Sequence, residues 1–442
     1  MAALPLFRGI DSAAGPSSRY ASIDGLRGFL ALGVFVFHLI VYRGFIETGL
    51  WQAPHDGFYA LLGPVGVSLF FMITGFLFWG KLLRAKGRPD WRALFVGRLF
   101  RIGPLYLFVV AVMLALVFLH TGFELHESGA AVTGAVLQWL ALGMVDTQPD
   151  VNGYEARHLL AGVTWTIFYE WAFYASLIAT ASFARGHRHL LFVAVALVLC
   201  LAGKTLFKVD TMGFAVLFLS GMAVASLLHD QHDRPIPDRQ ASSLALACLL
   251  LIFVASPGAY GSVTALMLAV FFYLVCSGAT LFGLLNSMPA RRLGNISYSL
   301  YLMQGLVLSA VFAIEPLRAA ALASAQAHWA VGLVCAGLLV TGASLAYAWI
   351  ERPGIALGQR LLRNNGLRAI SSFGGLDALA PDPERPRPLA AQRIEVLALQ
   401  KEWRTPKATP VWEPPATGAL PGAPELTEIA RLPSLEIDPM VA

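Results

Sequence analysis

Apolar runs of roughly 15 to 23 residues, separated by short polar loops, recur along the chain from residue 23 to residue 350. Each run is about as long as a helix that crosses the hydrocarbon core of a bilayer. No run alternates with a period of two, so helices are expected rather than strands. The ten predicted spans lie at roughly 23–42, 60–80, 102–120, 163–183, 189–203, 211–228, 241–256, 261–283, 293–314 and 328–350.

One further apolar stretch, from Ala131 to Val145, has about 15 residues, which fits an interfacial or re-entrant segment as well as a crossing. The lysines and arginines decide between these alternatives. If the stretch does not cross, the basic loops around 81–101, 185–188, 234–239 and 291–292 fall on one side, together with both termini. We therefore predict an all-α, polytopic bundle of about ten transmembrane helices in the inner (cytoplasmic) membrane, with cytoplasmic termini.

Composition agrees with a chain that lies mostly in lipid. Hydrophobic residues make up 57% of it and charged residues 13%, and the mean hydropathy is +0.64. The net charge of +5 could indicate nucleic acid, but the basic residues cluster in loops, so we expect a bilayer as partner and no nucleic acid. The four cysteines lie singly inside apolar runs without metal-ligand spacing, and no metal is expected.

The domain organisation follows from one change of composition. Residues 1–19 are predicted to form a cytoplasmic N-terminal segment, and residues 20–353 the transmembrane domain. Beyond Arg363, 12 of the 25 prolines fall between Pro381 and Pro439. We expect residues 364–442 to form a proline-rich, disordered cytoplasmic tail.

The first span, which begins "SIDGLRGFLALGVFVFH", carries an arginine and a histidine on one helical face. Arg27 and His38 are eleven residues apart, or about 1,100°, which is three turns plus about 20°. The rise is about 16 Å, so His38 lies past the bilayer centre if Arg27 lies at the cytoplasmic surface. An ionisable group at that depth indicates function, although a histidine bonded to a neighbouring helix and an arginine that reaches the headgroups are simpler alternatives.

A pair of arginines precedes the third span in "GRLFRIGPLY". Arg98 and Arg101 are three residues apart, so a helix places both guanidinium groups on one face. Such a pair suits phosphate oxygens, which a donor such as coenzyme A carries. The alternative is that both residues only anchor the helix at the cytoplasmic surface.

Polar side chains also interrupt two later spans. Glu170 lies in "TWTIFYEWAFY" close to Trp165, and a carboxylate there needs a partner such as His38 or a substrate hydroxyl. Tryptophan rings that line a site can also pack against the apolar face of a sugar ring. In "ISYSLYLMQ", Tyr301 and Gln304 either hold helices together or bind substrate.

Taken in this order, the segments resemble the acyltransferase 3 family of bacterial membrane proteins, which O-acylate polysaccharides, lipid-linked sugars, antibiotics and related acceptors. The resemblance rests on the four segments quoted above and on "GVSLFFMITGFLF" in the second span, and covers about residues 20 to 350. It implies transfer from cytoplasmic acyl-CoA, usually acetyl-CoA, to a carbohydrate or glycolipid acceptor.

The resemblance gives roles to five of these positions: the expected catalytic residues are His38, Glu170 and Arg27, and the expected donor-binding residues are Arg98 and Arg101. From the polar and aromatic pattern of their own segments, Trp165, Tyr301 and Gln304 are expected to bind substrate. Many family members have a histidine where this chain has Gln304, so we expect hydrogen bonding rather than proton transfer at this position.

These residues predict a mechanism. A neutral His38 would accept a proton from the acceptor hydroxyl as its oxygen attacks the thioester, with Glu170 or Arg27 fixing the orientation of the ring. An acyl-enzyme on His38 is an alternative. A proton-coupled transporter and a non-catalytic subunit of a polysaccharide assembly complex are rival functions. No motif identifies the acceptor, the acyl-chain length or the oligomeric state.

Overall fold

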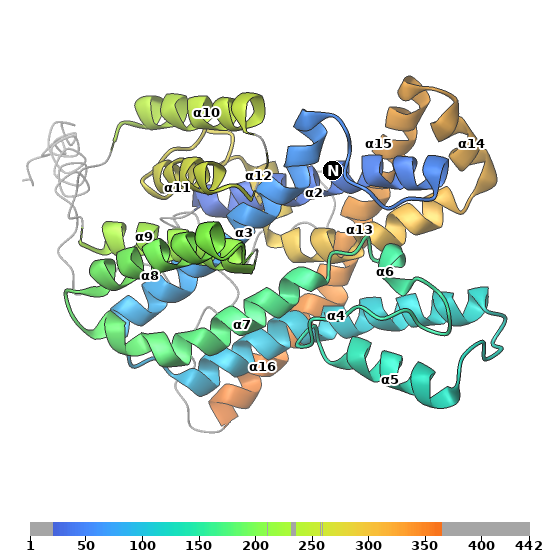
Figure 1. Ribbon diagram of the computed structural model, residues 1–442, viewed down its shortest axis with the longest axis horizontal. Helices are drawn as coiled ribbons and strands as arrows, with labels where there is room; N and C mark the ends of the chain where they lie inside the picture. Colours follow the sequence, from blue (N-terminus) through green and yellow to red (C-terminus); the bar gives the residue numbers. More distant parts are fainter. Residues whose placement is uncertain (1–20, 210, 231–235, 257, 259, 365–442) are drawn as a thin grey trace, which may run out of the picture. The chain divides into compact units, whose positions relative to one another are not determined.

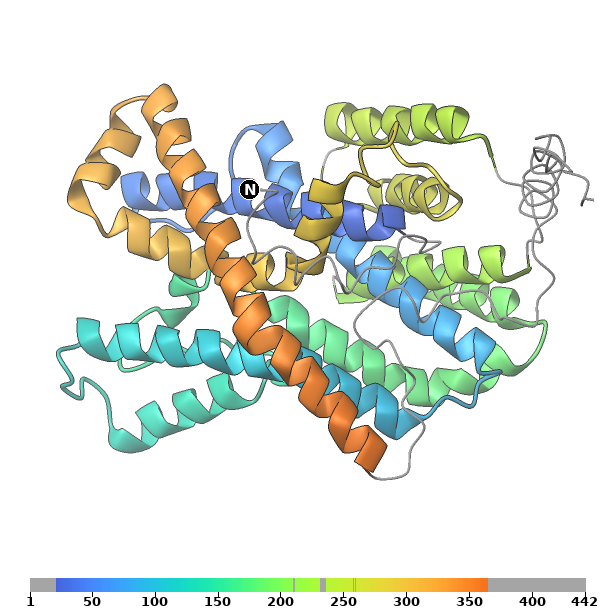
Figure 2. The same cartoon turned by 180° about the vertical axis from the view of Figure 1, so that it is seen from behind.

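The computed structural model describes residues 21–364 except 210, 231–235, 257 and 259, and this part of the chain is built from helices (Figures 1 and 2). The predicted N-terminal segment 1–19 and the tail from residue 365 onward lie outside the described residues. The elements are α2 (Ala21–Thr48), α3 (Gly57–Arg84), α4 (Trp91–His120), α5 (Gly129–Leu140), α6 (Ala156–Leu159), α7 (Trp165–Thr180), η1 (Ala181–Arg185), α8 (His189–Leu206), α9 (Thr211–Asp230), α10 (Asp238–Ala255), α11 (Ser262–Cys276), α12 (Met288–Asn295), α13 (Ser297–Phe312), α14 (Glu315–Ala323), α15 (Ala325–Ala346), η2 (Tyr347–Glu351) and α16 (Arg352–Asn364).

Each of the ten predicted spans falls on a helix, and the prediction of an all-α polytopic bundle is confirmed. Within the described residues, seven helices are long and apolar enough to cross a membrane, or eight if α12 and α13, which meet at 70°, form one span. Two predicted spans are shorter than expected: α7 has 16 residues and α11 has 15. Helix α5 has 12 residues, about 18 Å, which is too short for a crossing.

Capping side chains set the starts of two central helices. The Asp56 carboxylate accepts hydrogen bonds from the N–H groups of Phe58 and Tyr59, at 2.9 and 3.4 Å, where α3 begins. Asp90 accepts from the N–H of Ala93 at 2.9 Å at the start of α4. These bonds satisfy donors that the first turn of a helix leaves unpaired, so they fix where both helices begin.

Helix α3 packs closely against α9 through two glycines. A Cβ at Gly75 would overlap the carbonyl oxygen of Phe218, and one at Gly221 would overlap that of Met72. Small residues at such positions let the backbones of membrane helices approach each other. A hydrogen bond from Trp79 Nε1 to Ser226 Oγ, 2.8 Å long, joins the same two helices.

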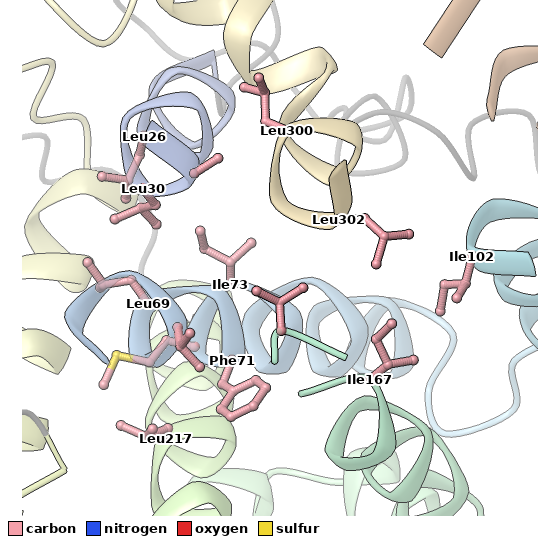
Figure 3. Packing of buried hydrophobic residues seen from close by; sticks show 14 of the residues in the cluster. Leu26, Leu30, Leu69, Phe71, Ile73, Ile102, Ile167, Leu217, Leu300 and Leu302 are labelled. Atoms are coloured by element: carbon pink, nitrogen blue, oxygen red, sulfur yellow. The ribbon is translucent and has the colours of Figure 1, made fainter. Parts of the chain in front are cut away.

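Buried side chains of α3 fill the space between its neighbours (Figure 3). Leu69, Phe71 and Ile73 point from α3 towards residues such as Leu30 of α2 and Leu217 of α9, and all five are at least nine-tenths buried. Helix α3 therefore holds α2 and α9 in fixed positions and presents its last turns to the site described below.

The C-terminal helices lie across α4 (Figure 2). Between α15 and α16 the chain makes the π-helical turn Tyr347–Glu351. Such turns are rare and frequently occur at functional sites. This one places Glu351, which is fully buried, beside α4.

Candidate active site

Five helices enclose a pocket with about 1200 Å³ of empty space, part of it open to the surroundings. We call it the cationic pocket. Its polar and charged lining residues are Arg27 of α2, Thr74 and Lys81 of α3, Arg98 and Arg101 of α4, Thr166, Glu170 and Tyr174 of α7, and Ser297, Tyr298 and Tyr301 of α13. Three phenylalanines, three isoleucines, a leucine and a valine complete the wall. The structure thus brings together five of the residues singled out in the sequence, namely Arg27, Arg98, Arg101, Glu170 and Tyr301.

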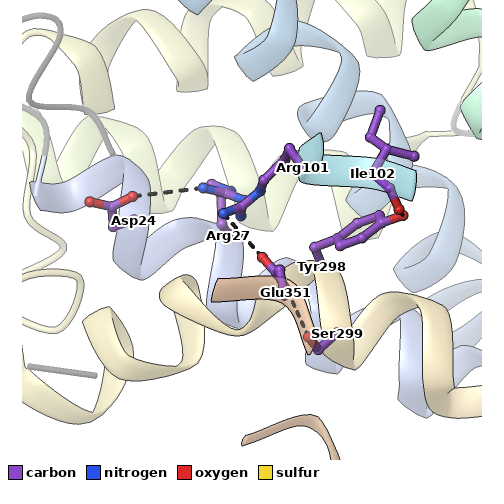
Figure 4. Close-up of polar contacts among 7 residues, drawn as sticks. All are labelled: Asp24, Arg27, Arg101, Ile102, Tyr298, Ser299 and Glu351. Carbon is purple, nitrogen blue, oxygen red and sulfur yellow. Dashed lines mark hydrogen bonds and ion pairs between the residues drawn. The ribbon is translucent and has the colours of Figure 1, made fainter. Parts of the chain in front are cut away.

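Two arginines of the pocket have carboxylate partners (Figure 4). Arg27 lies 3.9 Å from Asp24, one turn earlier on α2. Arg101 forms a 3.0 Å ion pair with Glu351, which also accepts a 2.7 Å hydrogen bond from Ser299. Since both side chains of the Arg101 pair are buried, the pair holds the guanidinium in one position.

Arg98 lies over aromatic rings instead. Its guanidinium carbon is 4.5 Å from the ring centre of Phe78 and 5.8 Å from that of Tyr174. Stacking of this kind orients an arginine without using its N–H donors. The Nε of Arg98 is buried and finds no hydrogen-bond partner among the described residues, so this donor is available to a ligand.

The acidic residue of the pocket pairs with a tyrosine. Glu170 accepts a 2.8 Å hydrogen bond from the hydroxyl of Tyr174, one turn later on α7. The lining holds four cationic side chains, Arg27, Lys81, Arg98 and Arg101, and this one carboxylate. With Asp24 and Glu351, which pair with Arg27 and Arg101, the four cations face three carboxylates. In a partly enclosed site such an excess of positive charge attracts anions.

His38 is buried on α2, and the residues that line the cationic pocket do not include it. Its Nδ1 lies 3.0 Å from the carbonyl oxygen of Val34 and 3.2 Å from Oε1 of Gln304. The amide of Gln304 in turn donates to the carbonyl oxygen of Tyr301 at 2.8 Å. The expectation that Glu170 or Arg27 orients His38 is therefore wrong, because Gln304 and the α2 backbone hold the ring.

These contacts determine the tautomer of His38. Both neighbours of Nδ1 are acceptor oxygens, and the Gln304 amide is fixed by its own bond to a carbonyl, so Nδ1 carries the proton. In the neutral ring, Nε2 then holds the lone pair. Such a ring can accept a proton through Nε2.

The remaining substrate candidates lie at the start of α7: Trp165 is its first residue, and Tyr301 of α13 contacts the same turn. The hydroxyl of Tyr301 donates to the Val163 carbonyl at 3.1 Å and lies 3.1 Å from that of Thr166. The indole of Trp165 contacts Phe71, with 6.3 Å between ring centres. Tyr301 therefore links the cationic pocket to the Gln304–His38 pair, whereas Trp165 lines a second cavity.

Three residues of this region were not singled out in the sequence as site residues. Lys81 is one of many basic loop residues, Glu351 follows the last span, and Tyr174 is one of several aromatic residues of an apolar helix. Only for Glu351 was there a signal, since a carboxylate next to an apolar span needs a partner.

Comparison with known proteins agrees with this arrangement. A family model described as an acyltransferase domain matches residues 20–349. No curated protein and no solved structure matches the chain. The family match covers well over half of the chain and includes His38, the cationic pocket and the long apolar helices. The chain therefore belongs to the acyltransferase 3 family of membrane acyltransferases.

Proposed function

We propose that this protein transfers an acyl group, in the first instance acetyl, from cytoplasmic acyl-CoA to a hydroxyl of a cell-surface or lipid-linked carbohydrate, and that it does so in the inner membrane. The observation that carries the proposal is the cationic pocket, in which Arg27, Lys81, Arg98 and Arg101 surround one enclosed space inside a helical bundle. A soluble polyanionic donor with a long flexible arm fits such a pocket better than a neutral substrate does.

The donor's phosphates are assigned to Arg98 and Arg101. Arg101 is held by its ion pair with Glu351, and Arg98 is held by the rings of Phe78 and Tyr174. Both guanidinium groups are thus positioned before the donor binds, which reduces the entropy lost on binding. The pantetheine arm would extend from there past Tyr301 towards His38.

His38 is assigned the role of general base. As the acceptor oxygen attacks the thioester carbon, the hydroxyl proton passes to Nε2, the carbon–sulfur bond breaks, and coenzyme A leaves as a thiolate that the imidazolium can protonate. Gln304 and the Val34 carbonyl keep Nδ1 protonated throughout. The ring therefore returns to its starting tautomer after each transfer.

The proposal is tested with purified protein in detergent or nanodiscs and [¹⁴C]acetyl-CoA. The acceptor probe is carbohydrate extracted from the envelope of cells that lack the gene. We expect label in the carbohydrate and free coenzyme A in equal amounts, with a mass increase in the same carbohydrate when the gene is restored. A transporter or a non-catalytic subunit would consume no acetyl-CoA, and that result would reject the enzyme.

A further inference from the structure

A second cavity lies next to the cationic pocket, about one turn further along α4 and at the first residue of α7. On α4, Ile102 lines the cationic pocket and Tyr106 lines the second cavity, a separation of about 6 Å along the helix. On α7, Thr166 lines the former and Trp165 the latter. We call this second space the polar cavity. Its position means that a molecule bound there lies next to the donor's pocket.

The polar cavity has an exposed mouth and a buried floor. Its empty space is about 680 Å³, part of it continuous with the surroundings. Asp146, Thr147 and Arg157 are exposed at the mouth, whereas Trp139 and Thr164 are buried at the floor.

Hydrogen bonds between neighbouring segments shape this cavity. Trp139 Nε1 donates to the Pro149 carbonyl at 2.9 Å, and the Thr147 hydroxyl donates to Gln138 Oε1 at 2.7 Å. Both bonds tie the loop after α5 back onto α5. The walls are thus preformed, as binding sites for small molecules usually are.

Two polar groups of the cavity have no hydrogen-bond partner among the described residues. Thr164 is 4% exposed, and its Oγ1 makes no hydrogen bond with any described residue. The same holds for the buried Nε2 of Gln148. Buried polar groups are normally paired, so an unpaired donor and an unpaired hydroxyl in one cavity indicate a ligand with its own hydroxyl groups.

The predicted topology agrees with this ligand. The cavity's mouth belongs to the segment between α4 and α7, which the distribution of basic residues places opposite the basic loops. The donor's phosphates are assigned to the other end of the same helices. An acceptor outside the cell membrane would approach from the side on which the mouth lies.

We infer that the polar cavity binds the acceptor, and that the acceptor is a carbohydrate whose hydroxyls pair with Thr164, Gln148 and Asp146 while a face of the sugar ring packs on Trp165. This inference rests on the proposed function and adds the place of the acceptor to it. Hydroxyl groups suit amide, carboxylate and hydroxyl partners, and the C–H groups of a sugar face suit an indole.

Two substitutions test the inference. Thr164→Val removes a hydroxyl that bonds to no described residue, and Gln148→Ala removes an amide whose nitrogen is unpaired. With [¹⁴C]acetyl-CoA and envelope carbohydrate from cells lacking the gene, each should raise the half-saturating carbohydrate concentration about two- to tenfold. The half-saturating concentration of acetyl-CoA should stay the same. Matched controls are Thr133→Val and Gln326→Ala, both exposed and outside the cavity.

The outcomes separate this inference from the proposed function. Suppose that the wild-type protein transfers acetyl and that Thr164→Val and Gln148→Ala have the same half-saturating carbohydrate concentration as the wild type. The polar cavity is then not the acceptor site. If the wild type transfers nothing, the proposed function itself fails, and the inference fails with it. A second readout labels Thr147→Cys with a membrane-impermeant maleimide. The same carbohydrate should slow labelling there but not at Gln326→Cys, and equal rates would overturn the inference.

Discussion

Substitution of Gln304 tests the positioning of the His38 ring separately from donor binding, because Gln304 contacts His38 but does not line the cationic pocket. Gln304→Met keeps the length of the side chain and removes its acceptor oxygen. His38 then retains only the bond of Nδ1 to the Val34 carbonyl, at 3.0 Å. The tautomer is therefore kept, while the ring gains freedom to rotate away from its productive position.

The size of the effect follows from the bond that is lost. One neutral hydrogen bond contributes about 0.5–1.5 kcal/mol, which corresponds to about a two- to thirteenfold fall in kcat. Loss of the base itself should be far larger, about 10²–10⁴-fold. Because Gln304 lies outside the cationic pocket, the KM for acetyl-CoA should not change.

Steady-state transfer from [¹⁴C]acetyl-CoA measures both quantities. Gln304→His, which can again accept a hydrogen bond from Nδ1, should recover part of the lost kcat, and Gln326→Met serves as the exposed control. If Gln304→Met falls as far as a variant without His38, Gln304 takes part in the chemistry. If it has wild-type kcat, Gln304 does not position the ring. Either result refutes the reasoning.

Three further substitutions test other parts of the account. Arg98→Ala should raise the KM for acetyl-CoA about ten- to a hundredfold, since a charge-assisted bond contributes about 1.5–3 kcal/mol. Arg92 is exposed on the same helix, and Arg92→Ala should leave this KM unchanged. Glu351→Ala should lower stability by about 3–5 kcal/mol because Arg101 is left buried without its counter-ion, seen as a lower unfolding temperature in detergent. Gly221→Ala should reduce the yield of monodisperse protein by clashing with α3, whereas Gly44→Ala, with open space around it, should not.

The helical bundle and most of the cationic pocket could be predicted from the sequence. Arg27, Arg98 and Glu170 each interrupt or border an apolar span, and a polar group in lipid must face an interior space. Three such groups from three spans therefore point to one shared site. The family resemblance leaves Gln304 a hydrogen-bonding role, and the structure places its Oε1 3.2 Å from Nδ1 of His38; its role in substrate binding stays a prediction.

Other features depend on packing that no local pattern encodes. The pairing of Arg101 with Glu351 requires the π-helical turn between α15 and α16, and nothing in the sequence around Glu351 predicts that turn. The predicted span 261–283 is too long because Leu281 and Phe282 are apolar but lie in a loop with positive φ, at 49° and 59°. Hydrophobicity alone cannot distinguish such apolar loop residues from helix.

The central claim is that His38 acts as the base in acyl transfer. Its most direct test is the kcat of purified His38→Ala for transfer from [¹⁴C]acetyl-CoA to envelope carbohydrate, with acetyl-CoA binding measured on the same sample. We expect a fall of about 10²–10⁴-fold with unchanged binding, since His38 does not line the donor's pocket. Transfer at the wild-type rate would contradict the account.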